Sequence, residues 1–205
     1  MNDLSEKMIA HYQRHASDWD ADRRSSGWND RAWHDRFVGL VREGASVLDL
    51  GCGGGSPVAD NLAAHGMHVT GVDSSSDLIA LCRDRLPDQE WIVSDMRGLQ
   101  LGGTFDGILA WDSFFHLGHD AQRTMFSVFA AHAHRDTVLM FNTGPAFGEA
   151  IGSYRGDPLY HASLDPDEYD GLLARHGFDR VDRVIEDPQA GGRTVWLARA
   201  THVQR

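Results

Sequence analysis

A run of glycines is the first feature of this sequence that could position a ligand. Glycine fills four of the five positions from Gly51 to Gly55, directly after the largely apolar segment 47–50. Glycine loses more backbone freedom on folding than any other residue, so such a cluster indicates backbone that another group must approach closely. Where a turn of this kind joins a strand to a helix, its N–H groups and the helix dipole favour an anionic or polar group. We therefore expect a ligand to lie across this backbone.

The spacing of these glycines differs from that of the common phosphate-binding loops. The dinucleotide fingerprint is G-x-G-x-x-G or G-x-G-x-x-A, whereas Gly51, Gly53 and Ser56 give G-x-G-x-x-S. The nucleotide-triphosphate loop G-x-x-x-x-G-K-[ST] is absent from the sequence. Asp49 precedes the first glycine by two positions, and its negative charge is a poor neighbour for pyrophosphate. It suits a ligand with a positive charge, or it serves as a hydrogen-bond acceptor that shapes the loop.

Two further aspartates follow at the spacing expected of successive strands. Asp73 lies 22 residues after Gly51, at the end of the segment MHVTGVD, where a carboxylate can accept both hydroxyls of a ribose. Asp95 ends the segment EWIVSD and can accept hydrogen bonds from an exocyclic amine such as that of adenine. The ligand implied has a ribose and a base, and it does not require a phosphate.

The elements that must position these residues alternate between strands and helices. Strands are expected at 46–50, 67–73, 90–95, 105–111 and 137–142, with helices between them. Ser56 and Pro57 predict a helix start, with serine as the N-cap and proline in the first turn. Alternation implies right-handed crossovers and a mostly parallel, Rossmann-like sheet with helices on both faces. Ligands bind outside the carboxyl ends of the strands in such sheets, which is where Gly51, Asp73 and Asp95 fall.

The two ends of the chain extend this core. Residues 1–42 predict two helices with a break near Gly27, and residues 145–163 predict an inserted loop or lid. Residues 165–168, Asp-Pro-Asp-Glu, resemble a capping box that starts a helix ending at Gly177. Segments 178–186 and 193–200 predict an antiparallel strand pair that closes the sheet.

Composition narrows the class of protein. The chain has 205 residues, 41% hydrophobic and 24% charged, which fits one globular domain. A net charge of −11 without a basic cluster disfavours nucleic acid as a partner. Two cysteines, no apolar run of about 20 residues and a polar N-terminal segment predict a cytoplasmic protein without a membrane partner.

Taken together, these motifs resemble class I S-adenosylmethionine-dependent methyltransferases. VLDLGCGGG is similar to their first motif, GVDSS to their second-strand acidic motif and SDM to their adenine-edge motif. FDGILAWDSFFHL is similar to their fourth-strand motif, and the terminal strand pair to their closing pair. The resemblance covers residues 45–200 and implies a seven-stranded sheet with an antiparallel closing strand. It divides the chain into a helical cap (1–42), a cofactor-binding core (45–143), a substrate-side insert (144–164) and a C-terminal part (165–205).

The resemblance also implies a role for each motif residue toward S-adenosyl-L-methionine. The glycines would line the methionine portion, Asp49 would face its amino group, and Asp73 would bind the ribose hydroxyls. Asp95 and the backbone of Met96 would hold adenine. The cofactor-binding residues implied are Asp49, Gly51, Gly53, Gly55, Asp73, Ser74, Asp95, Met96 and Trp111, with Ser75 as an additional contact.

Methyl transfer needs alignment and desolvation, and it needs a general base only if the nucleophile arrives protonated. His116 is the first candidate base because it follows the fourth strand and has an intrinsic pKa near neutrality. Asp112 is the second, and a structural role for His116 is an equal alternative. The pairs His11/His15 and His116/His119 have metal-ligand spacing but no evident third ligand, so no metal is expected. Aromatic residues available to a substrate pocket are Tyr12, Trp19, Trp28, Phe114, Phe115, Tyr154 and Tyr160. Tyr12 and Arg23 are candidates to reach the methionine carboxylate.

The function that follows is transfer of a methyl group to oxygen or nitrogen of a small molecule. One alternative is an NAD-dependent oxidoreductase, which the missing third glycine and Asp49 disfavour. Another is a non-catalytic domain that binds S-adenosylmethionine for regulation. The methyl acceptor and the oligomeric state do not follow from the sequence.

Overall fold

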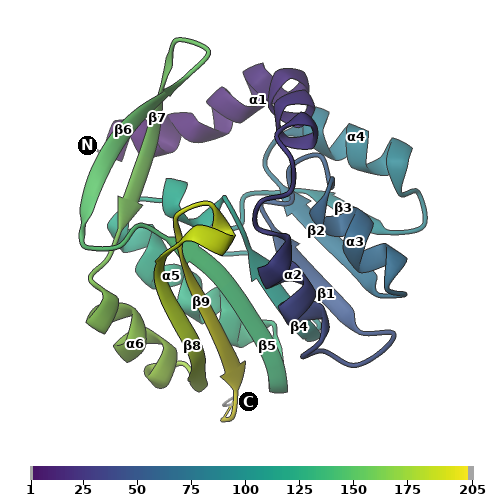
Figure 1. Ribbon diagram of the computed structural model, residues 1–205, viewed down its shortest axis with the longest axis vertical. Helices are drawn as coiled ribbons and strands as arrows, with labels where there is room; N and C mark the ends of the chain where they lie inside the picture. Colours follow the sequence, from purple (N-terminus) through teal and green to yellow (C-terminus); the bar gives the residue numbers. More distant parts are fainter. Residues whose placement is uncertain (1, 203–205) are drawn as a thin grey trace.

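A seven-stranded sheet forms the centre of the computed structural model, which describes residues 2–202 (Figure 1). The strand order is β3-β2-β1-β4-β5-β9-β8. The neighbouring strands from β3 to β5 pair in parallel, and β9 pairs antiparallel with both β5 and β8, as the sequence predicted. The strands are β1 (Ser46–Leu50), β2 (His68–Asp73), β3 (Glu90–Val93), β4 (Phe105–Ala110), β5 (Ala133–Thr143), β8 (Phe178–Asp187) and β9 (Arg193–Ala200).

Helices cover both faces of this sheet, and each face has its own apolar core. One core is formed with α5 (His119–Ala131) and α6 (Pro166–Arg175), and the other with α2 (Arg31–Val38), α3 (Val58–Ala64) and α4 (Ser76–Arg85). The central strands read as nearly continuous apolar runs because both of their faces are buried. Parallel strands with covered faces place their carboxyl ends at one edge, and this edge carries the polar residues discussed below.

Two elements lie above that edge (Figure 1). Helix α1 (Asn2–Ser25) crosses it and departs from helical geometry at His15. A separate two-stranded sheet, β6 (Gly148–Tyr154) and β7 (Asp157–Ser163), rises beside α1 and contacts it. The break near Gly27 between α1 and α2 agrees with the sequence, but the segment predicted as a loop is a regular hairpin.

Three local predictions were wrong. Ser56 does not cap α3, because the helix starts at Val58 after a cis Ser56–Pro57 bond. The strand β5 begins at Ala133, four residues earlier than expected. The start of α6 is not a capping box, since the Asp165 side chain accepts from the Asp167 N–H while Glu168 pairs with Arg123. Among residues 2–202, no helix combines the length and apolar character needed to cross a membrane.

Candidate active site

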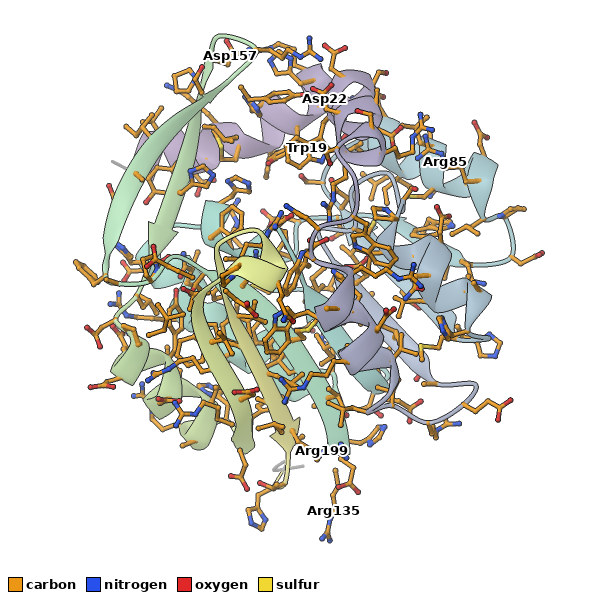
Figure 2. The ribbon with its side chains drawn as sticks, viewed as in Figure 1. Trp19, Asp22, Arg85, Arg135, Asp157 and Arg199 are labelled. Carbon is orange, nitrogen blue, oxygen red and sulfur yellow. The ribbon has the colours of Figure 1, made fainter. Side chains whose placement is uncertain are left out.

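A cavity lies under α1, at the carboxyl ends of β1, β2 and β4 and the segment after β3. It brings together most of the residues that the sequence singled out. Those on its wall are Gly51, Gly53, Asp73, Ser74, Asp95, Met96, Asp112 and His116. Helix α1 supplies the opposite wall through Ser5, Met8, Ile9, Tyr12 and Trp19. Figure 2 shows Trp19 on the underside of α1, facing the sheet.

Packing within the protein itself explains part of the absence of side chains from the glycine loop. A Cβ atom on Gly51, where φ is 77°, would lie 2.2 Å from the Cβ of Ser113. A Cβ atom on Gly54 would lie 2.2 Å from a carboxylate oxygen of Asp20. At Gly53 the nearest atom would be 3.9 Å away, so this glycine alone keeps open space toward the cavity. Close approach by a ligand therefore concerns Gly53, and close packing of the chain explains Gly51 and Gly54.

Asp73 connects the glycine loop to the start of α4. Its Oδ2 accepts a hydrogen bond from the N–H of Gly53 at 3.0 Å, and its Oδ1 accepts one from the N–H of Ser75 at 2.9 Å. Burial raises the pKa of Asp73, and the hydrogen bonds from backbone N–H groups act in the opposite direction. A carboxylate has about four lone-pair sites, so Asp73 can still accept a hydrogen bond from a ligand hydroxyl. Ser74 lines the cavity, whereas Ser75 is buried and caps α4.

Asp95 is held by Arg97, a residue that lies outside the predicted site. Arg97 donates to both carboxylate oxygens of Asp95, at 2.6–3.1 Å, and it also pairs with Glu6 of α1. Burial opposes ionisation of Asp95, but the hydrogen bonds from Arg97 outweigh it and leave its pKa below the ordinary value. Arg97 therefore ties the first turns of α1 to the edge of the cavity where Asp95 lies.

Asp49 lies outside the main cavity, in a small neighbouring one beneath the glycine loop. Burial, and secondarily the charge of Asp73, raises the pKa of Asp49 to about 7. No side-chain hydrogen bond to Asp49 is found within the described range 2–202. This carboxyl group is therefore only partly ionised near neutral pH, and a cation beside it would be strongly favoured. Gly55 and Trp111 also line this neighbouring cavity rather than the main one.

Trp111 and Asp112 directly follow β4 and lie in a network of charged side chains. The Trp111 Nε1–H donates to Asp30 at 2.6 Å, and Asp30 also accepts from Arg23 at 2.9 Å. Asp112 has a positive φ of 50° and accepts two hydrogen bonds from Arg193, at 2.6 and 2.7 Å. The Asp112 carboxylate also accepts from the side chain of Asn142. Both predicted residues are thus positioned by arginines from opposite ends of the chain.

His116 stands at the boundary between the main cavity and a larger one. Its Nδ1–H donates to the carbonyl oxygen of Tyr160 at 2.7 Å, which leaves Nε2 to accept from the Tyr12 hydroxyl, also at 2.7 Å. Burial lowers the pKa of His116 to about 4, so the ring is neutral at pH 7. Both nitrogens are satisfied in this one tautomer, and the structure therefore fixes the direction in which His116 can receive a proton.

The larger cavity, of about 530 Å³, lies between the hairpin, α1 and the β8–β9 turn. It shares Tyr12, Trp19, Asp112 and His116 with the main cavity, so the two spaces adjoin. Its other side chains include Phe115, Asn142, Glu149, His161 and Arg193. The expected pocket aromatics Phe114, Trp28, Tyr154 and Tyr160 do not line it: Phe114 is in the sheet core, and the hydroxyls of Tyr154 and Tyr160 bond Asp22 and Glu149.

Helix α1 is anchored above these cavities by ion pairs on several sides. Arg85 of α4 makes a two-pronged pair with Asp20 at 2.5 Å, and Arg155 of the hairpin turn pairs with Asp22 at 3.0 Å (Figure 2). Together with the pair between Arg97 and Glu6, these contacts hold α1 over the main cavity. Removal of α1 would expose this cavity to water.

Comparison with known proteins agrees with this geometry. The family model described as "Methyltransferase domain" matches residues 47–135. A ubiquinone biosynthesis O-methyltransferase of Aromatoleum aromaticum is 34% identical over 91 residues, 42% of this chain and 38% of the relative. An N,N-dimethyltransferase of Streptomyces fradiae, for dTDP-3-amino-3,6-dideoxy-alpha-D-glucopyranose, is 33% identical over 110 residues, 51% of this chain and 43% of the relative. The matched region spans less than half the length of these relatives.

Solved structures match over most of the chain. The amino pentose methyltransferase CalS10 of Micromonospora echinaspora, determined with S-adenosylmethionine bound, has a TM-score of 0.72 at 22% identity and covers 90% of this chain and 96% of its own. The 1,6-didemethyltoxoflavin-N1-methyltransferase of Burkholderia thailandensis has a TM-score of 0.73 at 20% identity, covering 97% and 88%. At these identities the likeness concerns the fold. The resemblance to class I S-adenosylmethionine-dependent methyltransferases is confirmed for the fold and for the central domain.

Proposed function

We propose that this protein transfers a methyl group from S-adenosylmethionine to an oxygen or nitrogen atom of a small molecule. The observation that carries the proposal is the pair of adjoining cavities under α1, which share Tyr12, Trp19, Asp112 and His116. One cavity offers the glycine loop and two carboxylates suited to a nucleoside, and the other has the size of a small-molecule pocket. The O- and N-methyltransferase names of the matched relatives support the same reaction class.

The first cavity provides a partner for each part of the donor. Asp73 would accept the ribose hydroxyls, Asp95 the adenine amino group, and Gly53 would line the methionine portion. Asp49 would face the methionine ammonium group across the loop, where its unpartnered carboxyl group gains a counter-ion. S-adenosylmethionine supplies an electrophilic methyl group on a sulfonium centre, so the protein contributes alignment and exclusion of water.

His116 and Tyr12 are placed to manage a proton at the boundary of the cavities. The lone pair on His116 Nε2 faces the Tyr12 hydroxyl. Because the pKa of His116 is about 4, this nitrogen is a weak base. We therefore assign His116 mainly to orienting the Tyr12 hydroxyl toward the acceptor and to relaying a proton from a protonated nucleophile. Asp112 is paired with Arg193, so its proposed part is to hold a polar group of the acceptor rather than to take its proton.

Binding and transfer can be tested separately. Calorimetry with S-adenosylmethionine, S-adenosylhomocysteine and NAD should give heat with the first two only, and the Asp73→Asn variant should bind at least about tenfold more weakly. Asp77→Asn, an exposed carboxylate at the start of α4, is the matched control. Labelled methyl donor and a panel of small phenols and amines then test transfer. Binding of NAD alone would favour an oxidoreductase, and donor binding without any transfer would favour a regulatory domain.

A further inference from the structure

A cluster of metal-ligating side chains joins α1 to the tip of the hairpin, outside the two cavities. His11 and His15 lie one helical turn apart on α1, and Asp157 is the first residue of β7. One ligand atom from each of the three side chains lies within 4.8 Å of the others. The sequence offered only the histidine pair, because Asp157 is separated from it by more than 140 residues. Figure 2 shows Asp157 at the hairpin tip, next to α1.

We propose that His11, His15 and Asp157 bind a divalent transition-metal ion, of which zinc is the best match. Two imidazoles and one carboxylate are a ligand set that zinc takes in proteins, with water in the fourth position. The proposal concerns a site separate from the proposed methyl transfer.

An unsatisfied nitrogen distinguishes this cluster from an ordinary surface ion pair. The His11 side chain is buried, and its Nε2 has no hydrogen-bond partner among the described residues. A buried polar atom without a partner is costly, and a metal ion would remove that cost. His15 already hydrogen-bonds Asp157 at 2.9 Å, so the carboxylate is in place.

The backbone around the cluster fixes the position of the carboxylate. Asp157 pairs with Tyr154 across a two-residue turn in which Arg155 and Gly156 both have positive φ, the geometry of a tight hairpin. Ligand atoms around a tetrahedral zinc ion lie about 3.3 Å apart, given bonds of about 2.0 Å. The ligand atoms must therefore approach one another by at most about 1.5 Å to hold the ion.

Access to the site is open on one side. A groove lined by His11, Arg14, Asp157 and Pro158 leads to the cluster. Arg14 pairs with Asp157, but its side chain is 62% exposed and can move into solvent when a metal ion takes the carboxylate. Such an exposed pair contributes little stability, so its loss is a small cost.

A bound ion would hold the hairpin against α1. Both elements line the larger cavity, α1 through Tyr12 and Trp19 and the hairpin through residues such as Glu149 and His161. Metal occupancy is therefore expected to restrict opening of that cavity, and its effect is on the mobility of the hairpin.

The test uses untagged protein, freed of metal with a chelator and titrated with Zn²⁺ by calorimetry. Wild-type protein should bind one ion, while His15→Ala and Asp157→Asn should each bind at least about 100-fold more weakly. His68→Ala, an exposed histidine of β2, is the matched control and should bind as the wild type does. Zn²⁺ should slow hydrogen exchange of the backbone amides of residues 148–163 in the wild type and in His68→Ala, but not in His15→Ala or Asp157→Asn.

Three results would overturn the proposal: no zinc binding by the wild type, equal binding by the His15 and Asp157 variants, or loss of binding in the His68 control. His15 and Asp157 are partly exposed, so their variants are expected to fold, which circular dichroism verifies. Neither readout depends on methyl transfer. Failure of this proposal is therefore distinguishable from failure of the proposed function.

Discussion

Replacing Asp49 with asparagine is expected to stabilise the ligand-free protein and, at the same time, to weaken donor binding. Asp49 is 2% exposed and its pKa is raised to about 7, first by burial and then by the charge of Asp73. A buried carboxyl group of this kind opposes folding once it ionises. The same group is the partner proposed for the methionine ammonium, so one substitution should move stability and affinity in opposite directions.

The stability effect follows from the two pKa values of this side chain. The folded value, about 7, lies above the unfolded value of 3.8, so the folded state retains a proton that the unfolded state has lost. Stability therefore falls as pH rises from about 4 to 7 and is constant above that, with a full span of about 4 kcal/mol. Asparagine removes this loss but remains a buried polar group, at a cost of about 1–3 kcal/mol. The net gain for Asp49→Asn is about 1–3 kcal/mol at pH 8, with none at pH 4.

Thermal unfolding and calorimetry measure the two effects. At about 2–4 °C per kcal/mol, the Tm of ligand-free Asp49→Asn should rise by about 2–12 °C at pH 8. Wild-type affinity for S-adenosylhomocysteine should increase about eightfold between pH 6.0 and 7.5, as the carboxyl group ionises. The variant should bind about 10- to 100-fold more weakly, with no such pH dependence.

Asp60→Asn, which changes an exposed carboxylate on α3, is the control and should alter neither quantity. A lower Tm for Asp49→Asn than for the wild type at pH 8 would refute the reasoning about burial. The same pH slope of affinity in both proteins would refute the ammonium contact.

Three further substitutions test the glycine loop, the anchoring of α1 and the boundary between the two cavities. Gly51→Ala should lower the free energy of unfolding, measured by chemical denaturation, by several kcal/mol, because its Cβ would lie 2.2 Å from another side chain. Gly66→Ala is the control, since Gly66 has a similar φ but open space around it, and it should lower the free energy of unfolding by only about 1 kcal/mol. Arg97→Ala should speed hydrogen exchange in the first turns of α1 and weaken donor binding about tenfold; unchanged exchange would contradict its anchoring role. Tyr12→Phe should lower kcat by about 10- to 100-fold, because it removes the hydroxyl that bonds His116 Nε2. Its affinity for S-adenosylhomocysteine should stay within about threefold of the wild-type value. An equal loss of binding would instead indicate a structural role for Tyr12.

The order of strands and helices could be predicted because each signal is local. Apolar runs that end in glycine or aspartate mark buried strands, and the spacing between them leaves room for one crossover helix each. Right-handed crossovers then place the ends of β1, β2 and the next strands at one edge, which is why Gly53, Asp73 and Asp95 meet around one cavity. The hairpin at 148–163 was missed because β6 is exposed along most of its length and has no alternating apolar pattern, although Tyr160 and Ala162 of β7 are buried.

The partners of the site residues could not be predicted, because they lie far away in the sequence. Arg193 is 81 residues from Asp112, and Tyr12 is 104 residues from His116. Such contacts depend on how α1, the hairpin and the β8–β9 turn pack over the sheet, which no local periodicity encodes. The same holds for the pKa of Asp49, since burial sets it and the residue type alone predicts an ordinary carboxylate.

The sequence by itself thus predicted the sheet and the edge at which the candidate site lies, since backbone geometry and strand polarity follow from short segments. Only the tertiary structure decided which side chains are charged, which proton positions are fixed and where Asp157 meets the histidines of α1. The reason is that electrostatics and hydrogen bonding depend on burial and on neighbours within a few ångströms, and these are brought together only when distant segments pack.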